Sequence, residues 1–318
     1  MKTIAVIGAG NIGKRYLQGL SPFCEKYEVH VVDSDENTIS RLSDEFASNG
    51  YRFHNDVSGL PERLDLCAIA TTSGARRSVL ERLFDNDVQI KNLILEKVLF
   101  QEKSDYYWAY EQFKNRHINA WINCIRRETG GYKQLKERMR SVSEFSIKIS
   151  GGEWGLCCNG IHFLDLIAFL TDQDSFSLEE SCLQTPIVES KREGYKECYG
   201  SFKGGVGKCK QFEICCNHDS YRSINIVLQT DQFLMCIDEE NRKACINPEK
   251  PGESFEIIQF DFPYVSEMMG RIVDNILKTG ECNLPRYETA ISLHVNYVKT
   301  ILSFFHENGM GGEKCPIT

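Results

Sequence analysis

Two periodicities of hydrophobic residues alternate over about the first 120 residues of the chain. Short apolar runs have the pattern of strands buried on both faces: KTIAVIG, YEVHVVD, LDLCAIA and NLILE, with INAWIN at 118–123 as one more. Amphipathic helical patterns separate these runs, at 11–20, 35–48, 74–86 and 102–116. Strands that alternate with helices predict an α/β domain built on a doubly wound parallel sheet.

The pattern changes after about residue 123. A predicted helix at 129–140, a strand at 142–150 and a helix from about Gly160 precede a series of strand-like segments at 180–188, 196–202, 208–216, 221–229, 232–237 and 254–261. Their alternating character predicts a large, mostly antiparallel sheet with one covered face in an α+β domain. Predicted helices at 264–279 and 286–306 follow. We expect two tightly joined domains, 1–122 and 123–318, with the final helix able to pack back on the first.

Composition excludes some classes of partner. The chain has 318 residues and a net charge of −8, and its short basic clusters, Arg76–Arg77 and Lys191–Arg192, are expected on the solvated surface. This argues against nucleic acid as a partner, because duplex binding needs a concentrated positive face. The sequence contains neither an apolar run long enough to cross a bilayer nor a signal-peptide pattern at its start, so we expect a cytoplasmic protein.

Fourteen cysteines could indicate disulfides or a metal site, but their spacing favours neither. There is no C-x-x-C pair, and most cysteines lie inside apolar runs, as Cys67 does in LDLCAIA. We therefore expect reduced thiols that pack as small hydrophobic residues in a reducing compartment, and no metal.

The clearest chemical motif is Gly8-x-Gly10-x-x-Gly13, between the first strand and the first helix. The first glycine permits a tight turn, the second lets the backbone approach a pyrophosphate, and the third lets helix and strand pack closely. Asp33 ends the next strand, where a carboxylate can bind the adenosine ribose and would repel a 2′-phosphate. NAD is therefore favoured over NADP. The alternative is a plain glycine turn, with Asp33 capping the next helix. Asn11 and Ile12 complete the predicted loop.

Two further strand ends would lie on the cofactor side of such a sheet, because ligands collect at the carboxyl ends of its strands. Thr71 and Thr72 follow LDLCAIA, and Glu96 and Lys97 follow NLILE. A lysine there could exchange a proton with a substrate, since burial and a cationic nicotinamide would lower its pKa. The alternative is that Glu96 and Lys97 form an ordinary solvated pair.

His162 and Asp165 stand three positions apart in the otherwise apolar stretch GIHFLDL. On a helix this spacing puts them on one face. From these residues alone, a satisfied polar pair in the core and a pair aimed at a substrate both remain open.

Taken in order, GAGNIG, ATTSGAR, LEKVLF and GIHFLDL resemble the Gfo/Idh/MocA oxidoreductases, the family of glucose–fructose oxidoreductase and inositol dehydrogenase. The similarity spans nearly the whole chain. It implies an N-terminal Rossmann domain and a C-terminal α/β domain with a large open sheet. It further implies NAD(P)-dependent chemistry on a sugar, cyclitol or sugar nucleotide, in homo-oligomers that associate through that sheet.

The resemblance also implies site residues, with two departures. Val98 replaces the proline of a Glu-Lys-Pro signature, and Cys158 replaces the first acid of Asp-x-Gly-x-His-x-x-Asp. A thiol is a poor substitute for a carboxylate in a proton relay. The implied catalytic residues are Lys97, His162 and Asp165. The implied substrate contacts are Lys97, Asn123, Arg126, Cys158 and His162, with interdomain packing as the alternative for Asn123 and Arg126. Trp154 could cover the pocket or be structural, and His294 is expected to be packed.

These features predict an NAD-dependent dehydrogenase in which Lys97, aided by His162, handles the proton of a secondary hydroxyl. Two alternatives remain. One is a cofactor-binding regulator of the same fold without turnover, which the changes at Val98 and Cys158 favour. The other is a redox-neutral sugar epimerase or lyase that uses NAD transiently. The sequence does not identify the substrate, because the fold leaves specificity to loops and sheet side chains.

Overall fold

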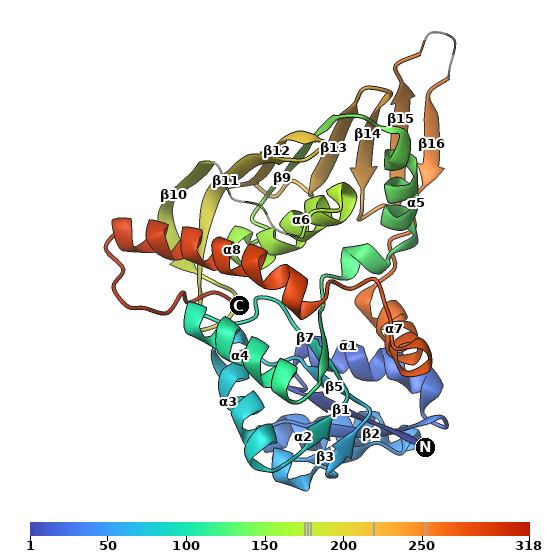
Figure 1. The fold of residues 1–318 in the computed structure, drawn as a ribbon, viewed down its shortest axis with the longest axis vertical. Coiled ribbons are helices and arrows are strands. Elements are labelled where there is room, and N and C mark those ends of the chain that lie inside the picture. The colour runs from blue at the N-terminus through green and yellow to red at the C-terminus, as the bar shows by residue number, and fades with distance from the viewer. Residues whose placement is uncertain (175, 177, 179, 219, 251, 253) are drawn as a thin grey trace. The chain divides into compact units, whose positions relative to one another are not determined.

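The alternating segments at the start of the chain form a parallel six-stranded sheet with helices between its strands (Figure 1). The computed structural model describes residues 1–318 except 175, 177, 179, 219, 251 and 253. The strand order is β3-β2-β1-β5-β7-β8. The strands are β1 (Lys2–Ile7), β2 (Tyr27–Val32), β3 (Arg52–His54), β5 (Leu66–Ile69), β7 (Asn92–Leu95) and β8 (Asn119–Ile122). The helices are α1 (Asn11–Leu20), α2 (Glu36–Glu45), α3 (Ser73–Asp85) and α4 (Lys103–Asn115).

This order explains where a ligand can bind. Without β4 (Arg63–Leu64) and β6 (Gln89–Ile90), which form a separate two-stranded sheet, it is the 3-2-1-4-5-6 order of dinucleotide-binding folds. All residues of β5 and β7 are buried, as expected for strands covered on both faces. The order reverses between β1 and β5, so the crevice at their carboxyl ends is the expected ligand site. The predicted doubly wound parallel sheet is confirmed.

The chain divides into two compact units. Unit 1 comprises Met1–Phe100, Ser104–Glu128 and Pro263–Glu288; unit 2 comprises Gln101–Lys103, Thr129–Phe262 and Thr289–Thr318. The division near residue 128 lies close to the predicted boundary, but the chain returns to unit 1 later. The helix that returns is α7 (Val265–Thr279), whereas most of the final helix, which we expected to be able to pack back, lies in unit 2.

Helix α7 packs against α1 at two glycines. A Cβ atom on Gly270 would lie 1.9 Å from the carbonyl oxygen of Gly19, so the two backbones are in direct contact. The buried face of α7, which includes Met269 and Val273, joins the same apolar core as Leu17 of α1. Close backbone approach therefore makes α7 part of the layer that covers the first sheet.

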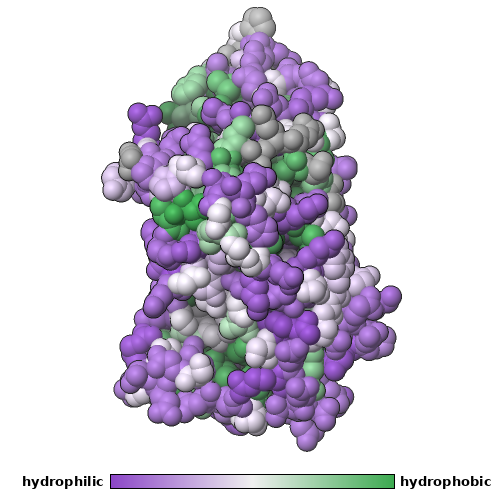
Figure 2. All heavy atoms as spheres, turned by 90° about the vertical axis from the view of Figure 1, so that its left-hand side faces the viewer, coloured by the Kyte–Doolittle hydropathy of each residue, from purple (hydrophilic) through white to green (hydrophobic). Residues whose placement is uncertain are grey.

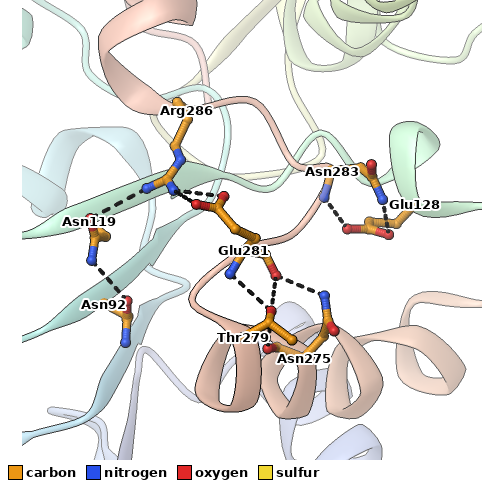
Figure 3. A network of polar contacts seen from close by, with 8 residues as sticks. All are labelled: Asn92, Asn119, Glu128, Asn275, Thr279, Glu281, Asn283 and Arg286. Carbon is orange, nitrogen blue, oxygen red and sulfur yellow. Dashed lines mark hydrogen bonds and ion pairs between the residues drawn. The ribbon is translucent and has the colours of Figure 1, made fainter.

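A polar network fixes the segment that follows α7 to the edge of the same sheet (Figure 3). The Arg286 guanidinium donates to both carboxylate oxygens of Glu281 at 2.8 Å, and to Asn119 Oδ1 at 3.5 Å. The backbone N–H of Ile122 in β8 donates to the carbonyl of Pro285 at 3.0 Å. The segment thus extends the sheet beside β8. The other members of the network are Asn92, Glu128, Asn275, Thr279 and Asn283.

Unit 2 contains a mostly antiparallel eight-stranded sheet of order β10-β11-β12-β9-β13-β14-β15-β16, in which only the β9–β12 pairing is parallel. Its strands are β9 (Phe145–Gly152), β10 (Glu180–Glu189), β11 (Lys196–Val206), β12 (Cys209–Asn217), β13 (Asn225–Thr230), β14 (Phe233–Asp238), β15 (Lys243–Pro248) and β16 (Glu256–Gln259). The helices of this part are α5 (Gly130–Arg138), α6 (Leu156–Thr171) and α8 (Tyr287–Glu307). The predicted C-terminal α+β architecture is confirmed.

One face of the second sheet is covered and the other is accessible. Along β9 the side chains of Phe145, Ile147 and Ile149 are buried, whereas Lys148 between them is exposed. Helices α6 and α8 lie on the covered face (Figure 1), where the ring of Phe202 in β11 packs 5.4 Å from that of Tyr297 in α8, measured between centroids. Alternating burial is what a sheet with one covered face requires.

The structure differs from the predictions in several strands, at the start of one helix and at one arginine. Strands β3, β4, β6 and β15 were not predicted: β4 and β6 have two residues each, β3 has three residues and no apolar run, and β15 ends in a proline. Helix α6 begins at Leu156 rather than near Gly160. No local side chain caps this start, so the sequence carried no signal that would have predicted it. Arg76 is fully buried, so the prediction that it lies on the solvated surface was wrong.

Hydrophilic side chains (purple) predominate on the face drawn in Figure 2, and hydrophobic ones (green) form small separate patches there. Among the described helices, none is both long enough and apolar enough to cross a membrane. Seven of the fourteen cysteines are buried. These cysteines contribute to the packing of their units as small apolar residues.

Candidate functional site

The glycine turn after β1 has the geometry that its three glycines predict. Gly8 has a φ of +86°, and a Cβ there would lie 2.8 Å from the backbone nitrogen of Thr71. A Cβ on Gly13 would lie 1.9 Å from the carbonyl oxygen of Gly8. In contrast, a Cβ on Gly10 would have no heavy atom within 4 Å. Two glycines are therefore required for packing, and the third leaves an open approach to the backbone.

The open side of this turn is the amino end of α1. Gly10 is its N-cap, and no side chain caps the first-turn amides, which belong to the partly or fully accessible Asn11 and Ile12 and to Gly13. Uncapped amides at a helix N-terminus favour an anion such as a pyrophosphate. The residues present thus fit the phosphates of a dinucleotide.

Asp33 holds the turn from the end of β2. Its Oδ2 accepts a hydrogen bond from the backbone N–H of Ala9 at 2.6 Å, and its Oδ1 accepts one from Asp35 at 3.0 Å. The N-cap of α2 is Asp35, whose side chain accepts from the N–H of Asn37. Asp33 is therefore not the helix cap that the alternative interpretation required, and its carboxylate belongs to the glycine turn.

The carboxyl end of β5 leads into Thr71 and Thr72, at the side of the turn. The Oγ1 atom of Thr71 is buried and has no hydrogen-bond partner among the described residues. Thr72 is the N-cap of α3, again without a side-chain capping bond. Thr71 lies beside Gly8, and its Oγ1 is a buried polar group that a ligand could satisfy.

Glu96 and Lys97 follow β7, and Glu96 is buried rather than solvated. Its Oε1 accepts hydrogen bonds from the Tyr16 hydroxyl at 3.0 Å and from Asn123 Nδ2 at 2.6 Å. Burial raises the pKa of the Glu96 carboxyl, and the amide of Asn123, the charge of Lys97, the hydroxyl of Tyr16 and the charge of Arg76 offset part of that rise. The solvated-pair alternative fails for Glu96, whose carboxyl joins α1, β7 and β8 in one buried network.

Arg76 of α3 holds the backbone around Lys97. Its guanidinium donates hydrogen bonds to the carbonyls of Thr71, Val98 and Leu99, so one buried cation joins two strand ends. The Lys97–Val98 peptide bond is cis, and Val98 stands where the family signature has proline. Lys97 itself is partly exposed at the end of β7. Arg76 is a positioning residue for this loop, and its polar sequence context, which predicted a surface position, gave no sign of this role.

In unit 2, helix α6 carries the second group of predicted residues. Cys158, Asn159 and His162 are its only partly exposed residues among 156–171; all others are buried. Asp165 is 1% exposed and therefore lies in the core, not on that accessible face. His162 thus lies on a face that a ligand can reach, whereas the buried Asp165 could affect a ligand only through another residue.

The remaining candidates are divided between the units. Asn123 is 4% exposed, and its Oδ1 has no hydrogen-bond partner among the described residues, while Arg126 is partly exposed in the short helix 125–128; both belong to unit 1. Trp154 packs edge-on against Phe163 and donates from Nε1 to the Cys215 carbonyl at 3.0 Å. His294 is fully buried in α8. In the part of the chain that the structure describes, no three His, Cys, Asp or Glu side chains are grouped to hold a metal ion.

Comparison with solved structures supports the fold, whereas comparison of sequences finds no related protein. No protein-family model and no curated protein matches the chain. Among solved structures, a Gfo/Idh/MocA family oxidoreductase from Vibrio cholerae is similar over 96% of this chain and 100% of its own, with a TM-score of 0.72 and 14% identity. The fold is that of the Gfo/Idh/MocA oxidoreductases. The predicted resemblance to these proteins is thereby confirmed at the level of the fold.

Two other solved structures are also similar to the chain over nearly its whole length. An oxidoreductase from Agrobacterium radiobacter, solved with NAD+, L-tartaric acid and magnesium, has a TM-score of 0.73 and 14% identity, covering 96% of this chain and 97% of its own. A super-repressor mutant of Gal80p from Saccharomyces cerevisiae has a TM-score of 0.76 and 12% identity, covering 96% of both chains. At these identities the similarity describes architecture, so function has to be argued from the residues.

Three residues of these sites were not among the predicted ones: Tyr16, Arg76 and Glu197. Tyr16 and Arg76 lie on buried helix faces, where periodicity predicts packing and says nothing of polar partners. Glu197 lies in β11 and reaches α6, about forty residues away in sequence. For Glu197 the only signal in the sequence was that no capping residue precedes α6, which suggests that a distant side chain takes that place.

Proposed function

We propose that the protein is an oxidoreductase that transfers a hydride between NAD and a secondary hydroxyl or keto group of a sugar, cyclitol or sugar nucleotide. The observation that carries the proposal is the glycine turn. Gly8 and Gly13 are closed by packing, Gly10 is open beside uncapped helix amides, and Asp33 holds the turn through Ala9. This combination provides a pyrophosphate cradle with a carboxylate nearby, and that carboxylate would repel the 2′-phosphate of NADP.

Bound in this cradle, a nicotinamide dinucleotide would accept or donate the hydride, and the chain itself would move the proton. We assign proton transfer to the Nζ of Lys97, a partly exposed amine at the end of β7. Next to it the carboxyl of Glu96 is held by Tyr16 and Asn123, and Arg76 fixes the backbone of the loop. The imidazole of His162, on the accessible face of α6, is assigned to binding the reacting hydroxyl. General acid–base catalysis of this kind contributes about 10²–10⁴-fold.

Replacing Lys97 tests the assignment. Lys97→Ala should lower turnover by about 10²–10⁴-fold with little change in NAD affinity, because the amine acts on the substrate proton and the glycine turn holds the dinucleotide. Turnover would be followed at the NADH absorbance band with a panel of glucose, myo-inositol, L-tartrate and uridine-diphosphate sugars. NAD and NADP affinities would be titrated separately. Lys91→Ala, an exposed lysine just before the same strand, is the matched control. Unchanged turnover in Lys97→Ala would refute the mechanism.

A second candidate is a regulator that binds NAD without turnover. Cys158 favours it, because a thiol replaces the acid that the family signature places on the accessible face of α6. The same measurements separate the candidates. A regulator would bind NAD and give no product with any member of the panel, whereas a redox-neutral enzyme would give product without net NADH.

A further inference from the structure

The accessible face of α6 is short, and it begins next to a carboxylate from another strand. Cys158, Asn159 and His162 are spaced so that they share one side of the helix, and every other residue of α6 is buried. At the amino end of this face lies Glu197 of β11, which is 8% exposed. The face therefore combines a thiol, an amide and an imidazole from α6 with one carboxylate from β11.

Glu197 is held by the first turn of α6. Its Oε2 accepts a hydrogen bond from the backbone N–H of Cys157 at 2.7 Å, and its Oε1 accepts one from Cys158 at 3.0 Å. The thiol of Cys158 also donates to this carboxyl. The N-cap, Gly155, has a φ of +79° and provides no side-chain cap, so the carboxylate from β11 takes that place. The helix dipole and three donors fix its position.

The carboxylate also lines a cavity that lies entirely within unit 2. The cavity has a volume of about 170 Å³, below the roughly 300–1,000 Å³ of drug-sized ligand sites, so it suits one small molecule or one ring of a larger one. Its lining includes the aromatic rings of Trp154 and Tyr199 and the side chains of Cys158, Asn159 and Glu197. Aromatic faces together with fixed hydrogen-bond acceptors suit a ring that carries hydroxyl groups.

Charge narrows the class of ligand. Three carboxyl side chains line the cavity, Glu153, Glu189 and Glu197, against a single lysine, Lys191, although Glu189 is also paired with Lys196 beside the lining. An anionic group would meet a net negative lining, whereas a hydroxyl can donate to a carboxylate. A neutral polyol or sugar ring therefore fits this cavity, and the phosphates of a nucleotide sugar would have to lie outside it.

We propose that Glu197 supplies, from β11, the carboxylate that α6 lacks at Cys158, and that it orients a polyhydroxylated substrate by accepting a hydrogen bond from one of its hydroxyls. This deepens the proposed function and rests on it for the reaction, but the binding step can be tested alone. Burial raises the pKa of Glu197, and the hydrogen bonds that it accepts from Cys158 and Cys157 offset part of that increase. Binding should therefore weaken as the pH falls through the titration of Glu197.

Cys158 provides the readout, because it is partly exposed and lines the same cavity. The rate of its alkylation by iodoacetamide would be measured by peptide mass spectrometry, with the partly exposed Cys24 of unit 1 as internal reference. The probes are myo-inositol, glucose and a uridine-diphosphate sugar. We expect at least one of them to protect Cys158 in the native protein. Glu197→Gln should weaken that protection by about tenfold or more and remove its pH dependence.

Matched variants separate recognition from helix capping. Glu193→Gln removes an exposed carboxylate close to β11 but outside the cavity lining and should leave protection unchanged. Cys158→Asp in the Glu197→Gln background returns a carboxylate to the face and should recover affinity for the protecting probe by calorimetry; Cys158→Ser should not. If Glu197→Gln lowers only the melting temperature and protection persists well below it, Glu197 serves only as a helix cap and the proposal is overturned.

The other outcomes are also decisive. Absence of protection by every probe in the native protein overturns the polyol class and the proposal with it. NAD affinity, measured by titration in the same variants, should not change. A native protein that fails to bind NAD would refute the proposed function, while the protection experiment would still decide the role of Glu197.

Discussion

Two histidines at the edge of the first sheet form a pair that requires a neutral ring. His30 Nδ1 lies 2.9 Å from His54 Nε2, and the rings stack at 5.1 Å between centroids with an interplanar angle of 7°. One ring nitrogen must donate and the other accept, so protonating both rings would break this bond. The backbone carbonyl of His54 accepts from the N–H of Asp33 at 3.2 Å, which connects the pair to the residue that holds the glycine turn.

This pair predicts a loss of stability in mild acid. Burial lowers the pKa of both histidines below 6.5; the charge of Arg52 adds to the effect at His54, and the Glu28 hydrogen bond opposes it at His30. A base with a lowered pKa in the folded state stabilises the fold above its unfolded pKa and loses that contribution as the pH falls below it. The free energy of unfolding should therefore drop between about pH 7 and pH 5.

The measurement is urea unfolding of the native protein and of His54→Gln across this pH range. The variant should show a shallower pH dependence, because one titrating ring has been removed. Comparison with the variant is needed because the raised pKa values of Glu96 and Glu197 act in the opposite sense. Identical slopes for both proteins would show that the pair does not control acid stability.

The role of a single residue could be predicted from the sequence only where its partners lie close to it in the chain. Gly8, Gly10 and Gly13 act within one turn, so their spacing predicted their roles. Arg76 lies in the first turns of α3 in a context that resembles surface, yet its partners are carbonyls up to 23 residues away. Likewise, Glu197 caps a helix 39 and 40 residues before it. Partners that only the fold brings together left no pattern in the sequence.

At the scale of elements, the crossing of α1 and α7 is the contact most sensitive to size. A Cβ on Gly270 would overlap the backbone oxygen of Gly19, and one on Gly19 would lie 2.9 Å from the nitrogen of Gly270. Backbone atoms cannot move aside as a flexible side chain can. Because α1 starts at the glycine turn, any displacement of α1 would also reach the predicted pyrophosphate site.

We therefore expect Gly270→Ala to destabilise the protein, although alanine is favoured over glycine in a helix by about 1 kcal/mol. Overpacking typically costs about 1–3 kcal/mol, and contact with a backbone oxygen places this site at the upper end. Urea unfolding should show the loss, and NAD affinity should fall with it. Arg271→Ala, at the neighbouring exposed position, should be close to neutral. A stabilised Gly270→Ala would mean that the helices can separate at little cost.

The order of elements was largely predictable, whereas the course of the chain between the units was not. Hydrophobic residues repeat with a period of 2 in strands and 3.6 in helices, because one side of each element is buried. This pattern predicted both sheets. The return of α7 to unit 1 depends on the close approach of Gly19 and Gly270 and on the contacts of Arg286 beside β8. Neither feature produces a periodic pattern of hydrophobic residues, so we had assigned α7 to the second predicted domain.

At the scale of the whole molecule, the open face of the second sheet is the surface that most needs an explanation. Ile257, Cys245, Cys236 and Val227 stand opposite one another across β16, β15, β14 and β13, and the row continues to Lys148 of β9. Ile257 is 65% exposed, although isoleucine on a sheet surface is normally covered. The row thus passes from an apolar end to the ion pair of Lys148 with Glu213, at 2.7 Å.

A second copy of the chain is the occupant we expect on this face, because one row carries apolar groups and charges of both signs that two copies can match. The protein should then sediment as a homo-oligomer under reducing conditions, which prevent cross-linking through Cys236 and Cys245. Val227→Arg should shift it towards the monomer without changing NAD affinity, since the glycine turn lies in unit 1. Glu307→Arg, exposed on α8, should leave assembly intact. A native protein that is monomeric at all concentrations tested would show that the open face has another purpose.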